Sequence, residues 1–234
     1  MKFPTLIEGR LVRRYKRFLA DVELADGTVV VAHCPNPGSM KTMKDEGAPV
    51  WLSQSNNPKR KLAYTWELVR AEEELTLVHT GRANAIVEEA MRGSVVSELR
   101  GFTSLQSEVR YGDKSRLDFM LQFLERRCYV EVKNVTMADG EGRCAFPDSV
   151  TARGSKHLRE LMSIAAEGHR AVLLFCCSKA GTCEIRPADE IDPVYGQTLR
   201  EAKRAGVEIL AYGCDIDLQS IALNKSLPIR LDQD

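Results

Sequence analysis

The sequence has no excess of charge of either sign, because its 33 lysines and arginines equal its 33 aspartates and glutamates. No global field therefore draws the protein to a polyanion or an anionic membrane, and any binding to nucleic acid must come from local patches. The chain also lacks an uncharged apolar run of the roughly 18 residues that a membrane span requires, and it starts without a signal-like segment. These absences predict a cytoplasmic protein that has no membrane partner.

Cysteine motifs with metal-ligand spacing are missing as well. The seven cysteines are odd in number and scattered, and no Cys-x-x-Cys pair occurs, which argues against a disulfide framework and against a zinc ribbon. Cys176 and Cys177 end an apolar run, so we expect them to be reduced thiols in a core. With 44% hydrophobic and 28% charged residues, the 234-residue chain has the composition of a folded protein of about two domains.

The first third of the chain predicts a small β-barrel. Turn sequences, of which Asp26-Gly27 is the clearest, separate five strand-like runs. A single open sheet of such short strands would leave its edges exposed, so we expect a closed, OB-like barrel over residues 1–82. The predicted strands are residues 18–24, 28–33, 49–53, 62–69 and 75–80.

After Gly81 the pattern changes to helices and strands that follow one another. This order predicts an α/β domain over residues 83–234, restriction-endonuclease-like in having a mixed sheet flanked by helices, so that the whole chain is α+β. Asp192 and Pro193 provide a helix start, and Gly206 a stop. Helices are predicted at residues 83–91, 151–167 and 192–205, and strands at residues 107–111, 117–121, 129–132, 171–177 and 207–212.

Two predicted strands of this domain carry acidic residues among apolar ones. In residues 116–121, strand alternation puts the apolar side chains at 117, 119 and 121 on one face and Asp118 on the other. In residues 129–133, it puts Glu131 and Lys133 opposite two valines. A desolvated carboxylate has to be paired, hydrogen-bonded or bound to a cation. Two carboxylates that meet across neighbouring strands could hold Mg²⁺ or Mn²⁺, with Asp118 and Glu131 as the metal ligands.

Such a site would have a definite chemistry. The cation could bind a phosphoryl oxygen and lower the pKa of a water, while Lys133 orients that water or offsets charge on the phosphoryl oxygens. These are the parts of a metal-dependent phosphodiesterase. The alternative is a plain cross-strand salt bridge among Arg116, Asp118, Glu131 and Lys133, since Glu-x-Lys alone is a common sequence.

These motifs resemble a known nuclease core. Arg-Leu-Asp-Phe-Met-Leu followed by Tyr-Val-Glu-Val-Lys is similar to the core of the PD-(D/E)xK nuclease superfamily. Along nearly its whole length the chain also resembles the sugar fermentation stimulation protein A family. The resemblance implies an N-terminal OB-like domain, a C-terminal nuclease-like domain, DNA binding and a regulatory link to sugar (maltose) use in bacteria. It rests on residues 14–21, 33–36, 59–61, 65–68, 107–112, 146–148 and 157–161.

Site residues follow from the superfamily resemblance. The metal-binding acids fall on Asp118 and Glu131, and the catalytic lysine falls on Lys133. The acid that the superfamily carries on its first helix falls on Glu89, and Glu108 is a second candidate for that place. Where the superfamily has a proline before the aspartate, this chain has a leucine.

Nine basic residues are candidates for contacting nucleic acid. Those of the barrel are interleaved with aromatic residues, a mixture that could follow a phosphate backbone and stack bases. A solvated basic face is the competing interpretation. The candidates are Arg13, Arg14, Lys16, Arg17, Lys59, Arg60 and Lys61 in the barrel, and Arg153 and Lys156 on the helix after the Glu-x-Lys strand.

The sequence leaves the function open between two main hypotheses. One is a metal-dependent nuclease that binds DNA through both domains. The other is a non-catalytic DNA-binding regulator of sugar metabolism that retains a nuclease scaffold. An RNA-processing or nucleotide-handling enzyme is a third class, because no residue distinguishes DNA from RNA. A homodimer is compatible with the sequence, which does not define the oligomeric state.

Overall fold

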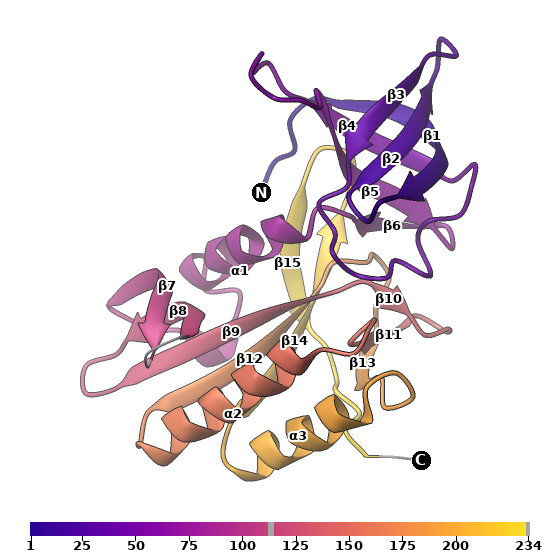
Figure 1. Ribbon diagram of the computed structural model, residues 1–234. Helices are drawn as coiled ribbons and strands as arrows, with labels where there is room; N and C mark the ends of the chain where they lie inside the picture. The colour runs from indigo at the N-terminus through magenta and orange to yellow at the C-terminus, as the bar shows by residue number, and fades with distance from the viewer. Residues whose placement is uncertain (112–114, 233–234) are drawn as a thin grey trace.

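A closed β-barrel forms the N-terminal part of the computed structural model, which describes residues 1–111 and 115–232 (Figure 1). The strands pair in the order β3-β2-β1-β4-β5, and a short parallel pairing of β3 with β5 closes the sheet on itself. The five-stranded barrel expected from the sequence is confirmed. Its strands are β1 (Leu6–Tyr15), β2 (Leu19–Leu24), β3 (Val29–His33), β4 (Pro49–Gln54) and β5 (Tyr64–Ala71), and β6 (Glu74–Leu77) continues the sheet from β5.

Strand β1 is not among the strands predicted from the sequence, although it pairs with both β2 and β4. Its composition hides it, because Gly9 and Leu11 are its only buried positions and three arginines interrupt its apolar residues. At Gly9 the strand lies so close to β2 that a Cβ atom would come within 2.6 Å of the Val22 side chain. The basic segment therefore runs through the middle of the barrel sheet rather than along a loop.

The C-terminal part is a mixed six-stranded sheet with helices on both faces (Figure 1). The strand order is β15-β14-β12-β9-β8-β7, in which β9, β12 and β14 are parallel and the other pairings antiparallel. The predicted mixed sheet flanked by helices is confirmed. Its strands are β7 (Ser104–Tyr111), β8 (Ser115–Gln122), β9 (Arg127–Val135), β12 (Arg170–Cys177), β14 (Glu208–Ile216) and β15 (Ile221–Ser226).

Three α-helices cover this sheet. Helix α1 (Ala83–Arg92) packs on one face, and α2 (Ala152–Ala166) and α3 (Pro193–Arg204) pack on the other. The Thr151 hydroxyl caps α2, and the Asp192 carboxylate caps α3 ahead of Pro193, as the sequence predicts for Asp192. No helix among the described residues is long and apolar enough to cross a membrane.

Smaller elements complete the fold. Short 3₁₀ helices lie at η1 (Thr80–Arg82) and η2 (Ser97–Leu99). Strands β10 (Met137–Ala138), β11 (Arg143–Phe146) and β13 (Glu184–Pro187) form a separate three-stranded sheet, which the sequence does not predict because the strands are short. Six of the seven cysteines are buried, as expected for core thiols, and Cys183 is exposed.

The two parts of the chain share one hydrophobic core. Trp51, Leu68 and Leu77 of the barrel belong to the same apolar cluster as α1 and the centre of the large sheet. The chain also begins in the C-terminal part, where the Ile221 N–H donates to the Met1 carbonyl at 2.9 Å. Barrel and sheet are therefore packed together rather than joined by a linker.

A buried ionic network lies at this junction. The carboxylate of Glu67, 1% exposed, accepts two hydrogen bonds of 2.7 Å from the Arg82 guanidinium and one of 2.7 Å from the Ser53 hydroxyl. His79 Nδ1 lies 3.0 Å from the same carboxylate. Burial by itself raises the pKa of Glu67, but the hydrogen bonds from His79, Arg82 and Ser53 outweigh it and lower the pKa to about 2.

We predict that Arg82→Ala lowers the free energy of unfolding by about 3–5 kcal/mol, because it leaves the Glu67 carboxylate buried without its main partner. Chemical denaturation measures the loss. Arg92→Ala is the control, since it removes only the exposed pair with Glu88 and should cost less than about 0.5 kcal/mol. Equal losses in the two variants would contradict the role given to Glu67.

The same carboxylate predicts a pH dependence. A lowered pKa in the folded state means that Glu67 stabilises the fold above its ordinary pKa of 4.5, and that this contribution disappears as the pH falls towards 2. The stability difference between the natural protein and Glu67→Gln should therefore shrink over this range. A difference that stays constant between pH 5 and pH 2 would contradict the assignment.

Candidate functional site

Asp118 lies where strands β8 and β9 separate. The Cα pairing of these strands reaches Phe119 and Val130, so Asp118 and Glu131 are the next residues beyond it. Asp118 Oδ2 accepts a hydrogen bond of 2.7 Å from the N–H of Val132, and Oδ1 accepts one of 2.8 Å from the Asn84 amide at the start of α1. The carboxylate thus takes the place of strand pairing at this point.

This interruption changes the direction of the side chains in β8. Phe119 and Leu121 pack in the cluster under α1, whereas Leu117 packs with Met120 in the cluster under α2. The expectation that residues 117, 119 and 121 share one face is therefore wrong for Leu117. Regular alternation requires a continuous ladder, and the ladder is broken where the Asp118 side chain binds β9.

Glu131 and Lys133 lie on the face of β9 that is covered by α2, while Val130 and Val132 lie in the cluster under α1, as predicted. Glu131 is 3% exposed. Its Oε1 accepts a hydrogen bond of 2.5 Å from Lys133 Nζ and also contacts His157 Nδ1 on α2. Its Oε2 is buried and has no hydrogen-bond partner among the described residues.

The two carboxylates differ in electrostatic surroundings. Burial raises the pKa of Asp118, and the charge of Glu131 raises it further. The hydrogen bonds from Val132 and Asn84 act to lower the pKa but do not bring it back to its ordinary value. Burial also acts to raise the pKa of Glu131, but the hydrogen bond from His157 and the charge of Lys133 outweigh it, and the pKa is lowered. The surroundings therefore favour the charged form of Glu131 and disfavour that of Asp118.

The site fits a divalent cation. Each Asp118 oxygen accepts one hydrogen bond and keeps a further lone pair, and Glu131 Oε2 keeps both. Mg²⁺ characteristically binds through one or two carboxylates and retains several waters. No group of three or more histidine, cysteine or acidic residues in the described part of the chain is arranged to hold a metal, so Asp118 and Glu131 would be its only protein ligands of these types.

The other two predicted acids have different partners. Glu89 accepts a hydrogen bond of 2.9 Å from the Met1 amino group, and Glu108 pairs with Arg116 at 3.2 Å on the surface. Neither contacts Asp118 or Glu131 through a hydrogen bond in the described structure. Arg116 pairs with Glu108, so it does not take part in the alternative cross-strand salt bridge with Asp118, Glu131 and Lys133. That salt bridge is realised only in the pair of Lys133 with Glu131.

Asn84 and His157 are the site residues that the sequence does not identify. Asn84 lies in the first turn of α1, far from Asp118 in sequence, and its neutral side chain does not indicate a metal site. His157 lies on the buried face of α2 with Leu158 and Leu161, so the sequence pattern indicates a core residue there. Its spacing of four from Arg153, whose Nε donates to His157 Nε2 at 3.3 Å, is the one local signal.

The basic residues of β1 and the turn after it divide into exposed and structural ones. Arg14 donates to the carbonyls of Asn36 at 2.9 Å and Gly38 at 3.1 Å, so its guanidinium supports that loop from within. Arg13 is exposed but pairs with Asp21 at 2.8 Å. Lys16 and Arg17 are exposed in the turn.

The remaining candidates lie in two places. Lys59, Arg60 and Lys61 are exposed in the loop between β4 and β5. Arg153 contacts His157 and so belongs to the surroundings of Glu131. Lys156 donates to the Ser115 hydroxyl at the start of β8. The structure therefore brings Arg153 to the acid pair and leaves the loop residues on the barrel.

Comparison with known sequences shows the family. Residues 81–220 match the sugar fermentation stimulation protein RE domain, and residues 12–78 match the SfsA N-terminal OB domain. This chain belongs to the sugar fermentation stimulation protein family. The family resemblance and the OB fold inferred from the sequence are both confirmed.

Relatives in the sugar fermentation stimulation protein family match the chain over its full length. The sugar fermentation stimulation protein homolog of Maricaulis maris is 53% identical over 235 residues, which is 100% of both chains. The homolog of Thioalkalivibrio sulfidiphilus is 53% identical over 98% of each chain. The structure of Pyrococcus furiosus SfsA in complex with Ca²⁺ matches with a TM-score of 0.89 and 25% identity, over 98% of each chain.

We predict that Asp118→Asn stabilises the metal-free protein by on the order of 1 kcal/mol, or about 2–4 °C in Tm, because it removes a poorly compensated charge. The raised pKa means that the carboxylate increasingly destabilises the fold as the pH rises above the ordinary value of 3.8. The gain should therefore grow from pH 4 to pH 7 in thermal unfolding, and added divalent cation should reduce it.

Asp217→Asn is the matched control for this substitution. The backbone N–H groups of Gln219 and Ser220 lower the pKa of Asp217, so its carboxylate is the favoured form in the folded state. Its amide variant should gain no stability. A gain in both variants, or in neither, would show that the surroundings of Asp118 are not the cause.

Proposed function

We propose that this protein is a DNA-binding phosphodiesterase that acts with Mg²⁺ or Mn²⁺ at Asp118 and Glu131. The observation that carries the proposal is the buried Oε2 of Glu131, which has no hydrogen-bond partner among the described residues, together with a second carboxylate, Asp118, whose pKa is raised by burial and by the charge of Glu131. A doubly charged cation would satisfy both groups. The relative from Pyrococcus furiosus has been seen in complex with Ca²⁺, which has the same charge and the same preference for oxygen ligands.

The chain's own residues have separable roles in this proposal. A cation held by Asp118 and Glu131 would stabilise charge on a phosphoryl oxygen and lower the pKa of a water. Asn84 orients Asp118 through its hydrogen bond to Oδ1. Lys133, whose side chain is 14% exposed, keeps N–H groups that can donate to a phosphoryl oxygen while one donates to Glu131.

His157 and Arg153 hold the Glu131 carboxylate in place. Arg153 Nε donates to His157 Nε2, and His157 Nδ1 contacts Glu131 Oε1, so the ring is held between the guanidinium and the carboxylate. The ring therefore directs Oε1 towards α2 and leaves Oε2 for a cation. The two residues act through Glu131 and are positioning residues.

A non-catalytic DNA-binding regulator of sugar use is the second candidate function. The observation that favours it is the close pairing of Lys133 with Glu131, together with the placement of Glu89 and Glu108 outside the acid pair. A protein that only binds DNA has no need of a vacant carboxylate oxygen in a buried site. Glu131 Oε2 is therefore the reason to prefer the enzyme.

Cleavage assays distinguish these functions. We expect the purified protein to cleave single-stranded, duplex or branched DNA, or RNA of the same sequence, with Mg²⁺ or Mn²⁺ and not with EDTA. Asp118→Ala, Glu131→Gln and Lys133→Met should each lower the rate at least roughly 100-fold. Arg100→Ala, which changes the exposed residue directly after η2, is the control. Binding without cleavage of any substrate would reject the enzyme and support the regulator.

The barrel's basic surface provides a separate prediction. We expect Arg13→Gln with Lys16→Gln to weaken binding to DNA and to make its dependence on salt shallower, by about 0.7–0.9 in log–log slope for each lost phosphate contact. Arg14 is left in place because it supports a loop. Lys203→Gln with Arg204→Gln on α3 removes the same charge elsewhere. If affinity and slope match those of this control, the β1 surface does not contact DNA.

A further inference from the structure

A hollow of about 440 Å³ lies between the barrel and the C-terminal part of the chain. The barrel contributes Arg17 and the loop at Asn36, and the C-terminal part contributes the end of β9 and the segment that leads into α2, as far as Arg153. Pockets of roughly 300–1,000 Å³ hold single small molecules. The hollow therefore has room for one nucleotide and not for a stack of base pairs.

Hydrogen bonds between the two walls hold this hollow open. Asp148 Oδ2, on the C-terminal side, accepts from the Ser39 N–H of the barrel at 2.7 Å and from its hydroxyl at 3.3 Å. Between the barrel sheet and the C-terminal part, the Leu77 N–H also donates to the Ser178 carbonyl at 2.8 Å. The shape is thus set before a ligand arrives, which lowers the entropic cost of binding.

The charge of the hollow favours an anion. Arg17 and Arg153 contribute one guanidinium from each wall, and each donates through Nε, to the Pro37 carbonyl and to His157. The Arg17 guanidinium also lies over the Phe18 ring, 5.7 Å from its centroid. Their Nη groups make no hydrogen bond with the described residues. The carboxylate of Asp148 is already engaged by the Ser39 N–H and hydroxyl, so the two cations remain available for a phosphate.

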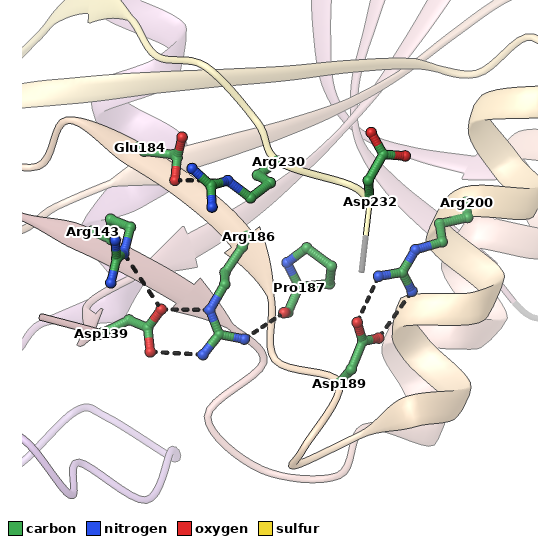
Figure 2. A pocket seen from close by; sticks show the side chains of 9 residues that line it. All are labelled: Asp139, Arg143, Glu184, Arg186, Pro187, Asp189, Arg200, Arg230 and Asp232. Carbon is green, nitrogen blue, oxygen red and sulfur yellow. Dashed lines mark hydrogen bonds and ion pairs between the residues drawn. The ribbon is translucent and has the colours of Figure 1, made fainter. Parts of the chain in front are cut away.

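A second hollow shows what an arginine-rich pocket looks like when its charges are matched (Figure 2). Arg186 is paired with Asp139, Arg200 with Asp189 at 2.5 Å, and Arg230 with Glu184 at 3.4 Å. An anion entering this pocket would have to break existing ion pairs. The junction between the walls, and not this pocket, is the place for a phosphate.

The rest of the junction hollow suits a base. Met137, Phe146 and Pro147 provide an apolar lining, against which a flat ring can stack. Asn134 accepts from the Ser178 hydroxyl through Oδ1, and its amide N–H groups make no hydrogen bond with the described residues. These N–H groups can donate to the Watson–Crick edge of an unpaired base. In a base pair that edge is already occupied by the partner base.

The hollow also adjoins the acid pair. Asn134 follows Lys133 directly on β9, and Arg153 reaches Glu131 through His157. We propose that the hollow binds one unpaired nucleotide of a nucleic-acid strand, its phosphate between Arg17 and Arg153 and its base against Phe146. This proposal rests on the proposed function. It makes the substrate a single strand, or a nucleotide extruded from a duplex, and the phosphodiester next to the bound nucleotide is then presented to Asp118 and Glu131.

Binding in EDTA tests the proposal apart from cleavage. The probes are a fluorescent single-stranded DNA, its RNA counterpart, the blunt DNA duplex and free deoxyadenosine monophosphate. We expect at least one single strand to bind about tenfold more tightly than the duplex, and Thr136→Trp, which fills the hollow, to abolish that preference and leave duplex affinity unchanged. Arg17→Gln leaves the C-terminal fold intact and should make the single-strand salt slope shallower by about 0.7.

Lys203→Gln on α3 is the charge control for Arg17→Gln and should leave the slope unchanged. Equal losses for single strand and duplex in Thr136→Trp, or no loss for either, would overturn the proposal. Binding of the free nucleotide as tight as that of the strand would also overturn it, because the hollow would then serve a free nucleotide. If the natural protein shows no preference for a single strand but still cleaves in a way that needs Asp118, the hollow alone is rejected. If the natural protein shows the preference but does not cleave, the enzyme alone is rejected.

Discussion

Asp118 and Glu131 bring two carboxylates to neighbouring strands of an otherwise apolar sheet, and the local structure is organised around them. Burying a carboxylate is costly unless hydrogen bonds or opposite charges replace its water. Asp118 replaces part of that water with hydrogen bonds from a backbone N–H of β9 and from the Asn84 amide of α1. The first of these bonds interrupts the pairing of β8 with β9. Glu131 is hydrogen-bonded to Lys133 and His157, yet its Oε2 has no partner in the part of the chain that the structure describes. A fold optimised for stability alone would place apolar side chains at both positions.

The second constraint is that the barrel and the mixed sheet pack as one body. The cluster under α1 includes barrel side chains, and the Glu67 network ties the entry of α1 to strands of the barrel. Since α1 carries Asn84, the geometry of Asp118 depends on how the barrel packs. A loop of the barrel, fixed by Asp148, likewise forms one wall of the hollow beside the acid pair. The OB domain is therefore part of the construction of the site.

Charge balance in this chain is achieved locally as well as in total. Arg14, Arg82 and Arg186 are taken up by carbonyls or carboxylates and support loops and junctions. Such residues contribute little field to the surroundings, since each is already paired. Arginines with guanidinium groups turned to an open hollow are a different case, and Arg17 and Arg153 bring two of them to the same place from separate parts of the chain. Any anionic ligand is drawn to such points rather than to the molecule as a whole.

The sequence by itself determined the barrel, the mixed sheet with its helices, and the face shared by Glu131 and Lys133, because hydrophobic periodicity and turn residues act over short distances along the chain. It did not reveal β1, whose buried positions are reduced to Gly9 and Leu11, nor the partners of Glu89 and Glu108. Only the tertiary structure decided that Asn84 and His157 meet the acid pair, that Leu117 leaves the face predicted for it, and that Arg17 and Arg153 share a hollow. Contacts between residues tens of positions apart depend on how helices and domains pack, and no local pattern of residues encodes that packing.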